Sequence, residues 1–288
     1  MTTKTSIRFF ADKEVRAIWD DDSAQWWFSV VDIIAAITDS QNPRKYWSVL
    51  KTRLKQKDSQ LTTKCRQLKL TAADGKKYAT DCFAQSDIIA IAKAIPHKRA
   101  LEFLDWFTYG DNTIDGKSKI KAYTLFESSL LDEIEVGTVK GLQQIHAYLF
   151  GGLYDFAGQI RQKNIAKNGF QFALAQFLPE TLQKIERMPE ENFAQIADKY
   201  IEMNIAHPFM EGNGRSMRIW LDLMLKRKLK QCVDWSKIGK NEYMNAMRQN
   251  PTDGSKIKQL LKNALTTQIN SREMFMKGID YSYYYEEN

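Results

Sequence analysis

The chain has 288 residues, of which 43% are hydrophobic and 12% aromatic, enough for two domains with separate cores. Its formal charge is +7, no apolar stretch approaches the ~20 residues of a membrane span, and the start lacks the apolar run of a signal peptide. The three cysteines are odd in number and far apart, which argues against a disulfide framework or a cysteine metal cluster and predicts a soluble cytoplasmic protein.

Residues 1–110 show the pattern of a small α+β domain. Apolar alternation predicts short strands, and a run without alternation after Ser29 predicts a capped helix. The turn at 73–76 predicts a hairpin. The expected strands are Ile7–Phe10, Arg16–Trp19, Trp26–Val30, Leu68–Thr71 and Tyr78–Thr80, and the expected helices are Val31–Ile37, Lys45–Lys55, Gln85–Ala94 and His97–Phe107.

Basic residues gather in one stretch of this first part. Residues 43–77 hold 11 basic and 2 acidic side chains, which is the electrostatic signature of an acidic partner. Phosphate contacts with DNA are one interpretation, and docking of a protein is the other. The candidate contact residues are Arg44, Lys45, Lys51, Arg53, Lys55, Lys64 and Arg66.

The polar segment 109–118 has two glycines and little apolar content, which predicts a linker over 111–118. Residues 119–288 then read as a second, mainly helical domain. Apolar residues at helical spacing predict helices over Leu142–Leu149, Asn192–Ala206 and Ile219–Lys230. The interruption at 158–172, with Asn168-Gly169 at a turn position, predicts a β-hairpin.

The segment from His207 to Arg218 combines the parts of a phosphate site. Pro208 ends one helix, and a Gly212-Asn213-Gly214 loop opens the next, which leaves free N–H groups and a positive dipole end for an anion. Arg215 and Arg218 share a helix face beside that site. A carboxylate, Glu211, stands at the same loop as a candidate Mg²⁺ ligand, and His207 stands at its mouth as a candidate base.

This segment resembles the signature of the Fic family, His-Pro-Phe-x-(Asp/Glu)-Gly-Asn-Gly-Arg-x-x-Arg, at every defined position, and Phe156–Arg161 resembles an upstream element of that family. The resemblance implies an all-helical Fic fold that transfers AMP from ATP, with Mg²⁺, to a Tyr, Thr or Ser hydroxyl of a target protein. It implies that His207 is the base and Glu211 the metal ligand. The implied nucleotide-binding residues are Lys167, Asn204, Gly212, Asn213, Gly214, Arg215, Ser216 and Arg218.

The hairpin corresponds in this resemblance to the family's flap, which holds the target by strand addition. Its residues are Asn164, Ile165, Ala166, Lys167, Asn168, Gly169, Phe170 and Phe172. The C-terminus resembles the family's inhibitory motif, with Ser282 and Glu286 four residues apart in an expected helix over 275–288, although Glu287 stands where the family has Gly or Asn. Glu286 is then implied to pair with Arg218. A released tail would offer candidate self-modified residues, Tyr281, Tyr283, Tyr284 and Tyr285.

Residues 7–108 resemble the Bro-N domain of phage antirepressors, through Trp26–Asp32, Asn42–Trp47, Cys65–Leu68 and the 73–77 turn. That family is associated with DNA binding. Two other functions stay open: transfer of a different phosphate-containing group, and a DNA-binding regulator whose Fic half senses nucleotide. The sequence leaves the target, the acceptor residue type and self-association undecided.

Overall fold

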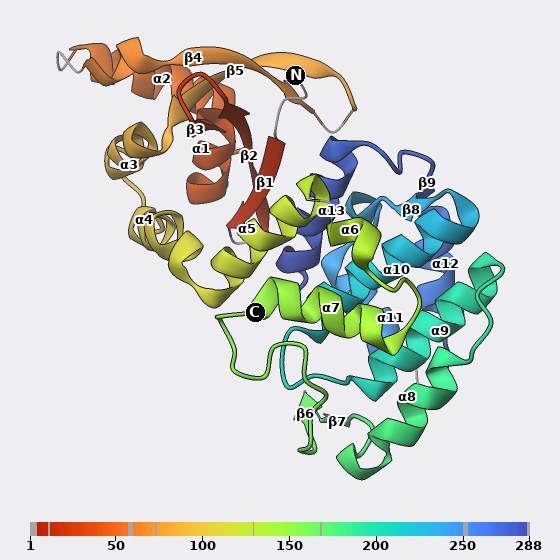
Figure 1. Ribbon diagram of the computed structural model, residues 1–288. Helices are drawn as coiled ribbons and strands as arrows, with labels where there is room; N and C mark the ends of the chain where they lie inside the picture. The colour runs from red at the N-terminus through yellow and green to blue at the C-terminus, as the bar shows by residue number, and fades with distance from the viewer. Residues whose placement is uncertain are drawn as a thin grey trace. The chain divides into compact units, whose positions relative to one another are not determined.

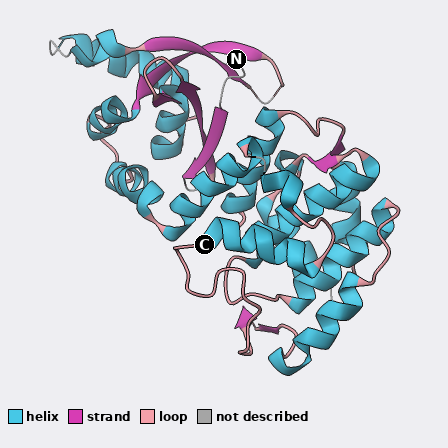
Figure 2. Cartoon of the chain, viewed as in Figure 1, coloured by secondary structure: helices cyan, strands magenta, loops and turns pink. Residues whose placement is uncertain are grey.

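The computed structural model describes residues 5–10, 12–56, 60–72, 74–128, 130–167, 169–249 and 253–286. The chain divides into two compact units, Met1–Thr113 and Ile114–Asn288, and each is described by itself. Unit 1 combines strands with helices, whereas unit 2 is mainly helical (Figures 1 and 2). The predicted mainly helical protein with an α+β first part is therefore confirmed, and the Bro-N resemblance stays a prediction.

Unit 1 is built on one antiparallel sheet in the order β1-β2-β3-β5-β4. Its strands are β1 (Thr5–Phe10), β2 (Lys13–Asp20), β3 (Gln25–Ser29), β4 (Arg66–Thr71) and β5 (Lys77–Ala84), and its helices are α1 (Val30–Thr38), α2 (Pro43–Gln56), α3 (Gln85–Lys93) and α4 (Ala100–Tyr109). Short 3-10 turns lie at Gln60–Lys64 and Gly110–Asn112.

The strand pleat divides the core of unit 1 between the two faces of the sheet. Val15 and Ala17 of β2 pack with Phe28 against the helices, while Ile18 packs on the opposite face with Trp27. Alternation along the strand produces this split, because successive side chains point to opposite faces. Ser29 caps α1 as expected, since its hydroxyl accepts a hydrogen bond from the Asp32 amide.

Unit 2 is built mainly from helices. Its helices are α5 (Ile114–Glu127), α6 (Leu130–Glu133), α7 (Val139–Phe150), α8 (Leu178–Glu186), α9 (Phe193–Ala206), α10 (Asn213–Leu229), α11 (Lys240–Gln249), α12 (Ser255–Asn263) and α13 (Arg272–Tyr284), with 3-10 turns at Ala175–Phe177 and Trp235–Lys237. Two short strand pairs accompany them: β6 (Ala166–Lys167) with β7 (Phe170–Gln171), and β8 (Cys232–Val233) with β9 (Leu265–Thr266). Among the described residues, no helix has the length and apolar composition to cross a membrane.

Helix α10 is the centre of this unit because nearly all of its sides are covered. It packs against α7, α9 and α13, and Trp220, Leu221 and Met224 on it are fully buried. The helix expected over Ile219–Lys230 is thus the second half of a longer helix, which begins in the glycine loop. Its surroundings fix the position of the loop to which it is joined.

Three expectations differ from the structure of unit 2. Residues 114–118 of the expected linker form the first turns of α5, because Ser118 is buried against the rest of the unit rather than exposed. The domain is not all-helical outside the flap, since β8 and β9 pair across α11 and α12. Only four residues of the 158–172 hairpin are in strands, because residues 159–165 are held by side-chain bonds to the loops around them.

Candidate functional site

His207 ends helix α9 in a backbone conformation that is uncommon for a residue other than glycine. Its φ is 49°, in the left-handed region, and its amide donates to the Met203 carbonyl at 3.0 Å. The ring atom Nδ1 lies 3.2 Å from the Asn204 carbonyl oxygen. A carbonyl can only accept a hydrogen bond, so Nδ1 carries the proton and Nε2 is left as the proton acceptor.

The surroundings of His207 keep its imidazole neutral. Burial lowers the pKa of His207 to about 4, even though the carbonyl of Asn204 and the carboxylates of Glu286 and Glu211 act in the opposite direction. The ring stacks on Phe172, with centroids 3.8 Å apart and an interplanar angle of 15°. A neutral ring with a free Nε2 can take a proton at physiological pH.

Arg161 holds the strained turn at His207 against the base of the flap. Its guanidinium donates to the carbonyls of His207 at 2.8 Å, Ala206 at 3.1 Å, Lys163 at 2.7 Å and Ala173 at 2.5 Å. The side chain is 3% exposed, so these carbonyls replace the water that it has lost. The buried Arg161 guanidinium thereby links the turn at His207 to the segments that lead into and out of the β6–β7 hairpin.

The side chains of Asn213 and His146 close the loop 208–212, and nothing in the sequence indicated this structural role. The Asn213 amide accepts from the Phe209 N–H and donates to the Phe209 carbonyl, both at 2.8 Å. His146 of α7 bridges the Gly158 amide at 2.8 Å and the Glu211 carbonyl at 2.9 Å, and burial lowers its pKa to about 4. The Asn213 side chain therefore closes the loop, and its residue also lines the cavity described below.

The first turn of α10 faces a cavity of about 450 Å³. Gly212 opens the helix with a φ of 78°, and a Cβ built on it would collide with the Phe150 ring. The cavity is lined from the flap, from α9 and α10, and from α11. Its lining residues are Ile165, Ala166, Lys167, Phe170, Phe172, Asn204, Ile205, His207, Met210, Glu211, Asn213, Gly214, Arg218, Tyr243, Met244, Met247, Arg248 and Glu286.

Arg218 is bound by the C-terminal segment. Its Nη2 donates to Glu286 Oε1 at 2.6 Å and to the Ser282 carbonyl at 2.7 Å, and its Nε donates to the Ser282 hydroxyl at 2.7 Å. The Arg218 side chain is 2% exposed, so these bonds compensate a fully buried charge. Although burial raises it, the pKa of Glu286 lies below its usual value because of Arg218. A Cβ on Gly214 would collide with the Glu286 carboxylate, so Glu286 lies against the helix terminus.

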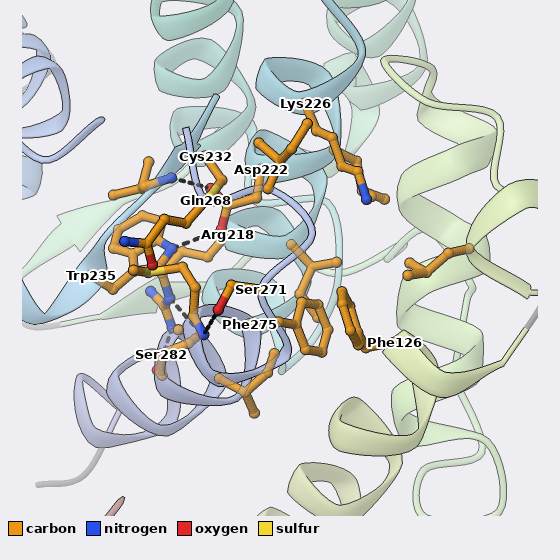
Figure 3. A pocket seen from close by; sticks show the side chains of 18 residues that line it. Phe126, Arg218, Asp222, Lys226, Cys232, Trp235, Gln268, Ser271, Phe275 and Ser282 are labelled. Carbon is orange, nitrogen blue, oxygen red and sulfur yellow. Dashed lines mark hydrogen bonds between the residues drawn. The ribbon is translucent and has the colours of Figure 1, made fainter. Parts of the chain in front are cut away.

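A second, small cavity of about 60 Å³ lies between α10 and α13, and Arg218 is among the residues that line it (Figure 3). Ser282 and Phe275 of α13 border it, and so does Asp222 of α10. The Asp222 carboxylate accepts from the Trp235 indole at 2.9 Å, and burial raises its pKa to about 7. Helix α13 thus packs against α10 with a small cavity between them.

Arg215, which the sequence implies to be a nucleotide-binding residue, is not among the residues that line the larger cavity. Its Nη2 lies 3.0 Å from Glu211 Oε1, and its Nη1 is bound to Asp115 of α5. The ring of Phe150 lies 5.0 Å from its guanidinium carbon. The Ser216 hydroxyl is buried in α10 without a hydrogen-bond partner, so its side chain faces the core and not a ligand.

The flap residues fall into two groups. Ile165, Ala166, Lys167, Phe170 and Phe172 line the cavity, whereas Asn164 accepts from the Ala175 amide and Gly169 forms the turn. Lys167 Nζ lies 4.0 Å from Glu286 Oε2. Asn168 and Glu287 lie outside the described residues. Asn204 donates from its side chain to the Tyr200 carbonyl at 2.8 Å, which fixes it at the cavity wall.

The C-terminal helix begins earlier and ends earlier than expected, since α13 spans Arg272–Tyr284 and Glu286 follows in a turn. The Ser271 hydroxyl caps its start. Two of the candidate acceptor tyrosines are buried: Tyr283 donates to Ser118, and the Tyr285 hydroxyl lies 2.8 Å from the Trp235 carbonyl. Tyr281 and Tyr284 are half-buried.

The basic residues of unit 1 are only partly available to a partner. Lys51 is paired with Asp81 and Lys64 with Asp87, each at 2.8 Å. Arg66 is paired with Asp20 at 2.8 Å, and it lies over the Trp27 ring. The carboxylates that engage these three side chains come from strands β5 and β2, for Asp81 and Asp20, and from the first turn of α3, for Asp87. The remaining four candidates, Arg44, Lys45, Arg53 and Lys55, lie on α2.

Residues 137–225 match the Fic/DOC family. This part of the chain is similar to Fic domains. It has homology to protein adenylyltransferases: the protein adenylyltransferase VbhT of Bartonella schoenbuchensis is 28% identical over 176 residues, which cover 56% of this chain and 36% of VbhT. The probable protein adenylyltransferase Fic of Salmonella typhimurium is 32% identical over 104 residues, covering 31% of this chain and 52% of that protein.

The matches to these relatives thus span about a third of VbhT and about half of the Salmonella protein. Among solved structures, the BepC protein of Bartonella tribocorum with bound AMPPNP has a TM-score of 0.46 and 19% identity. That match covers 53% of this chain and 84% of BepC.

Sequence reasoning missed several residues of the site. Asp115 and His146 reach the Fic loop from α5 and α7, and Tyr243, Met244 and Met247 line the cavity from α11. No local motif marks them, because their roles depend on contacts between distant segments. The Phe156–Arg161 element did mark Arg161, but not the carbonyls that it would bind.

The neutral state of His207 can be observed directly. We expect its ring to stay neutral, with the proton on Nδ1, as the pH falls to about 5, and to protonate only near pH 4, because burial disfavours the charged form. A histidine in water would titrate near pH 6.5. ¹⁵N-detected NMR of the imidazole, assigned with a His207→Asn variant, measures both properties. A midpoint near 6.5 would contradict the expected burial.

Removing the Arg161 guanidinium should loosen the catalytic turn. Arg161→Lys keeps the charge but cannot reach four carbonyls, so we expect unfolding of the Fic domain to become easier by about 3 kcal/mol. Urea denaturation measures this, and hydrogen exchange of residues 206–208 tests whether the loss is local. Arg187→Lys, at the exposed end of α8, is the matched control and should change stability little. Equal stability of both variants would refute the assigned role.

Proposed function

We propose that this chain is a protein adenylyltransferase that transfers AMP from ATP to a hydroxyl side chain of another protein. One observation supports this most: a neutral imidazole with a free Nε2 shares a cavity with a helix N-terminus and Arg218. The helix end offers N–H donors and a positive dipole to phosphates. The adenylyltransferase relatives of the Fic domain point to the same chemistry.

In the proposed reaction, Nε2 of His207 takes the proton of the target hydroxyl. The hydroxyl oxygen then forms a bond to the α-phosphorus of ATP, and the bond from that phosphorus to the bridging oxygen of the β-phosphate breaks. Pyrophosphate leaves with the electron pair. The backbone N–H groups at Gly212–Gly214, together with Arg218, would bear the negative charge of the phosphates, so catalysis rests on positioning and electrostatics.

Mg²⁺ fits the donor set at Glu211. Its side chain is 51% exposed, and one carboxylate oxygen is occupied by the Gly212 amide and Arg215. Mg²⁺ in nucleotide sites is commonly held by one or two carboxylates, waters and substrate phosphates, which a single half-exposed glutamate satisfies. When bound, the ion would supply positive charge to the phosphates. In the described residues, no cluster of three acidic, His or Cys ligands competes for a metal.

The flap and α11 suit the two substrates in different ways. The paired segments β6 and β7 present a short strand edge beside His207, to which an extended target segment could be added by main-chain hydrogen bonds. Met244 and Met247 of α11 give the opposite wall an apolar surface. Thioether side chains adapt to flat rings, so this wall suits the nucleobase.

The C-terminal segment acts in this proposal as a brake. The Glu286 carboxylate lies against the terminus of α10 and binds Arg218, where the outer phosphates of ATP would otherwise lie. The cavity beneath α13 makes release of the segment easier. Self-modification at the tail tyrosines would require that release, because Tyr283 and Tyr285 are buried while the tail is docked.

Labelled ATP separates AMP transfer from its alternatives. With the Glu286→Gly protein, we expect label from the α-phosphate, and not from the γ-phosphate, to become bound to protein. Adding His207→Ala should lower this rate by about 100-fold or more, because the general base is lost. Scintillation counting of precipitated protein measures the transfer. Label from the γ-phosphate alone would indicate phosphorylation, and no label from either would indicate a nucleotide sensor.

Two substitutions test the brake by changing the charge or the volume of the side chain at position 286. Glu286→Gly should raise the initial rate of α-label transfer by ~10- to 100-fold, the worth of a buried charge-assisted bond that no longer excludes phosphate. Glu286→Gln keeps the volume and removes the charge, so we expect a smaller rise. Steady-state rates at one ATP concentration measure both. Equal rates for all three proteins would exclude a brake at this residue.

A further inference from the structure

Two arginines of the Fic loop are each bound by a carboxylate from outside the loop. Glu286 binds Arg218, and Asp115 of α5 binds Arg215. Both guanidiniums are buried, at 3% exposure for Arg215 and 2% for Arg218. The loop's own carboxylate, Glu211, takes the other terminal nitrogen of Arg215. Each arginine that could meet a polyphosphate therefore already has anionic partners.

Carboxylates offset most of the positive charge in and beside the site in this arrangement. Three cations, Arg215, Arg218 and Lys167, are in contact with three carboxylates, Glu211, Asp115 and Glu286. His207 adds no charge while it is neutral. Arg248 also lines the cavity and bonds to the neutral Asn245 side chain, so a triphosphate would meet one positive charge beyond the offset ones, and release of Glu286 would add one more. Electrostatic attraction of a polyanion needs a surplus of cations, so release of a second carboxylate would matter.

Asp115 is the carboxylate that can leave at least cost. Its side chain is 57% exposed, against 17% for Glu286. It stands in the first turn of α5, where a carboxylate is stabilised by the positive end of the helix dipole even without a partner. Arg215 would keep Glu211 as a partner after Asp115 turns to water. The Asp115 contact is therefore suited to be made and broken.

Helix α5 also holds the C-terminal helix. Lys119 Nζ lies 2.9 Å from the fully buried Asp280 carboxylate, which also accepts from the Tyr123 hydroxyl. The preceding residue, Ser118, accepts from Tyr283 at 3.0 Å. The helix that carries Asp115 is thus bonded to the helix that leads to Glu286. Movement of either helix would disturb the other's hold on its arginine.

We propose that Asp115 is a second inhibitory latch, which neutralises Arg215 while α5 and α13 are docked together and must be released for ATP to bind tightly. The inference rests on the proposed adenylyltransferase activity and adds to it a regulatory residue on α5. Two latches on bonded helices are coupled, so opening one weakens the other. This coupling distinguishes the arrangement from two independent contacts.

Four proteins test the latch: the wild type, Asp115→Asn, Glu286→Gly and the double variant. We expect Asp115→Asn to tighten binding of a fluorescent ATP analogue by about three- to fivefold, as expected for a partly exposed ion pair. In the double variant the gain should fall short of the product of the single gains, because each single change already weakens the other latch. The α-label rate should follow the same order. Asp132→Asn, an exposed aspartate in the first turn of α6, removes the same charge elsewhere and should change neither quantity.

The outcomes separate the latch from the proposed activity. If the Glu286→Gly protein transfers α-label but Asp115→Asn binds the analogue like the Asp132→Asn control, the latch is wrong and the activity stands. Weaker binding by Asp115→Asn would show that Asp115 instead positions Arg215, which also overturns the latch. If none of the proteins transfers α-label, the proposed activity is wrong. The binding measurements would still test whether the Asp115 contact weakens binding of the ATP analogue. Asp115→Ser serves as a second variant at this position. Thermal unfolding checks that all five variants, including the Asp132→Asn control, remain folded.

Discussion

The buried guanidinium of Arg218 is the constraint on which the site depends. A cation with almost no exposure needs acceptors for its N–H groups, and loss of a partner without replacement is costly. In this structure Ser282 and Glu286 supply those acceptors. Phosphate oxygens have the same chemistry and would reach the same nitrogens. The C-terminal segment and the phosphates of a nucleotide would thus be alternative hydrogen-bond acceptors for Arg218, which is buried because helix α10 is enclosed.

The rest of the catalytic loop is held by side chains whose polar groups point inward. Arg161 binds four carbonyls around the His207 turn, the Asn213 amide pairs with the Phe209 backbone, and His146 bridges Gly158 and Glu211. These bonds let His207 keep a left-handed backbone that would otherwise cost free energy. The functional atoms are few, and a larger set of buried polar groups fixes their positions.

Much of this could be predicted from the sequence because the decisive residues are adjacent in it. The 207–218 segment contains the proposed base, the carboxylate and both arginines, and the 3.6-residue period located α7, α9 and the core half of α10. Local patterns could not reveal that Asn213 turns inward, since its partner is the backbone four residues earlier. They also could not show that Arg215 faces Asp115, which is 100 residues away in the sequence. The salt bridges of Lys51, Lys64 and Arg66 depend likewise on which strands and helices become neighbours.

Because Glu286 lies against the terminus of α10, its contact with Arg218 would depend on the concentration of free nucleotide. A carboxylate on the same chain is a tethered competitor, and short tethers give effective concentrations on the order of millimolar. Free nucleotide at comparable concentration would then displace it by mass action, whereas traces of nucleotide would not. The strength of docking by α13, including the void beneath it, would set the concentration at which that exchange occurs.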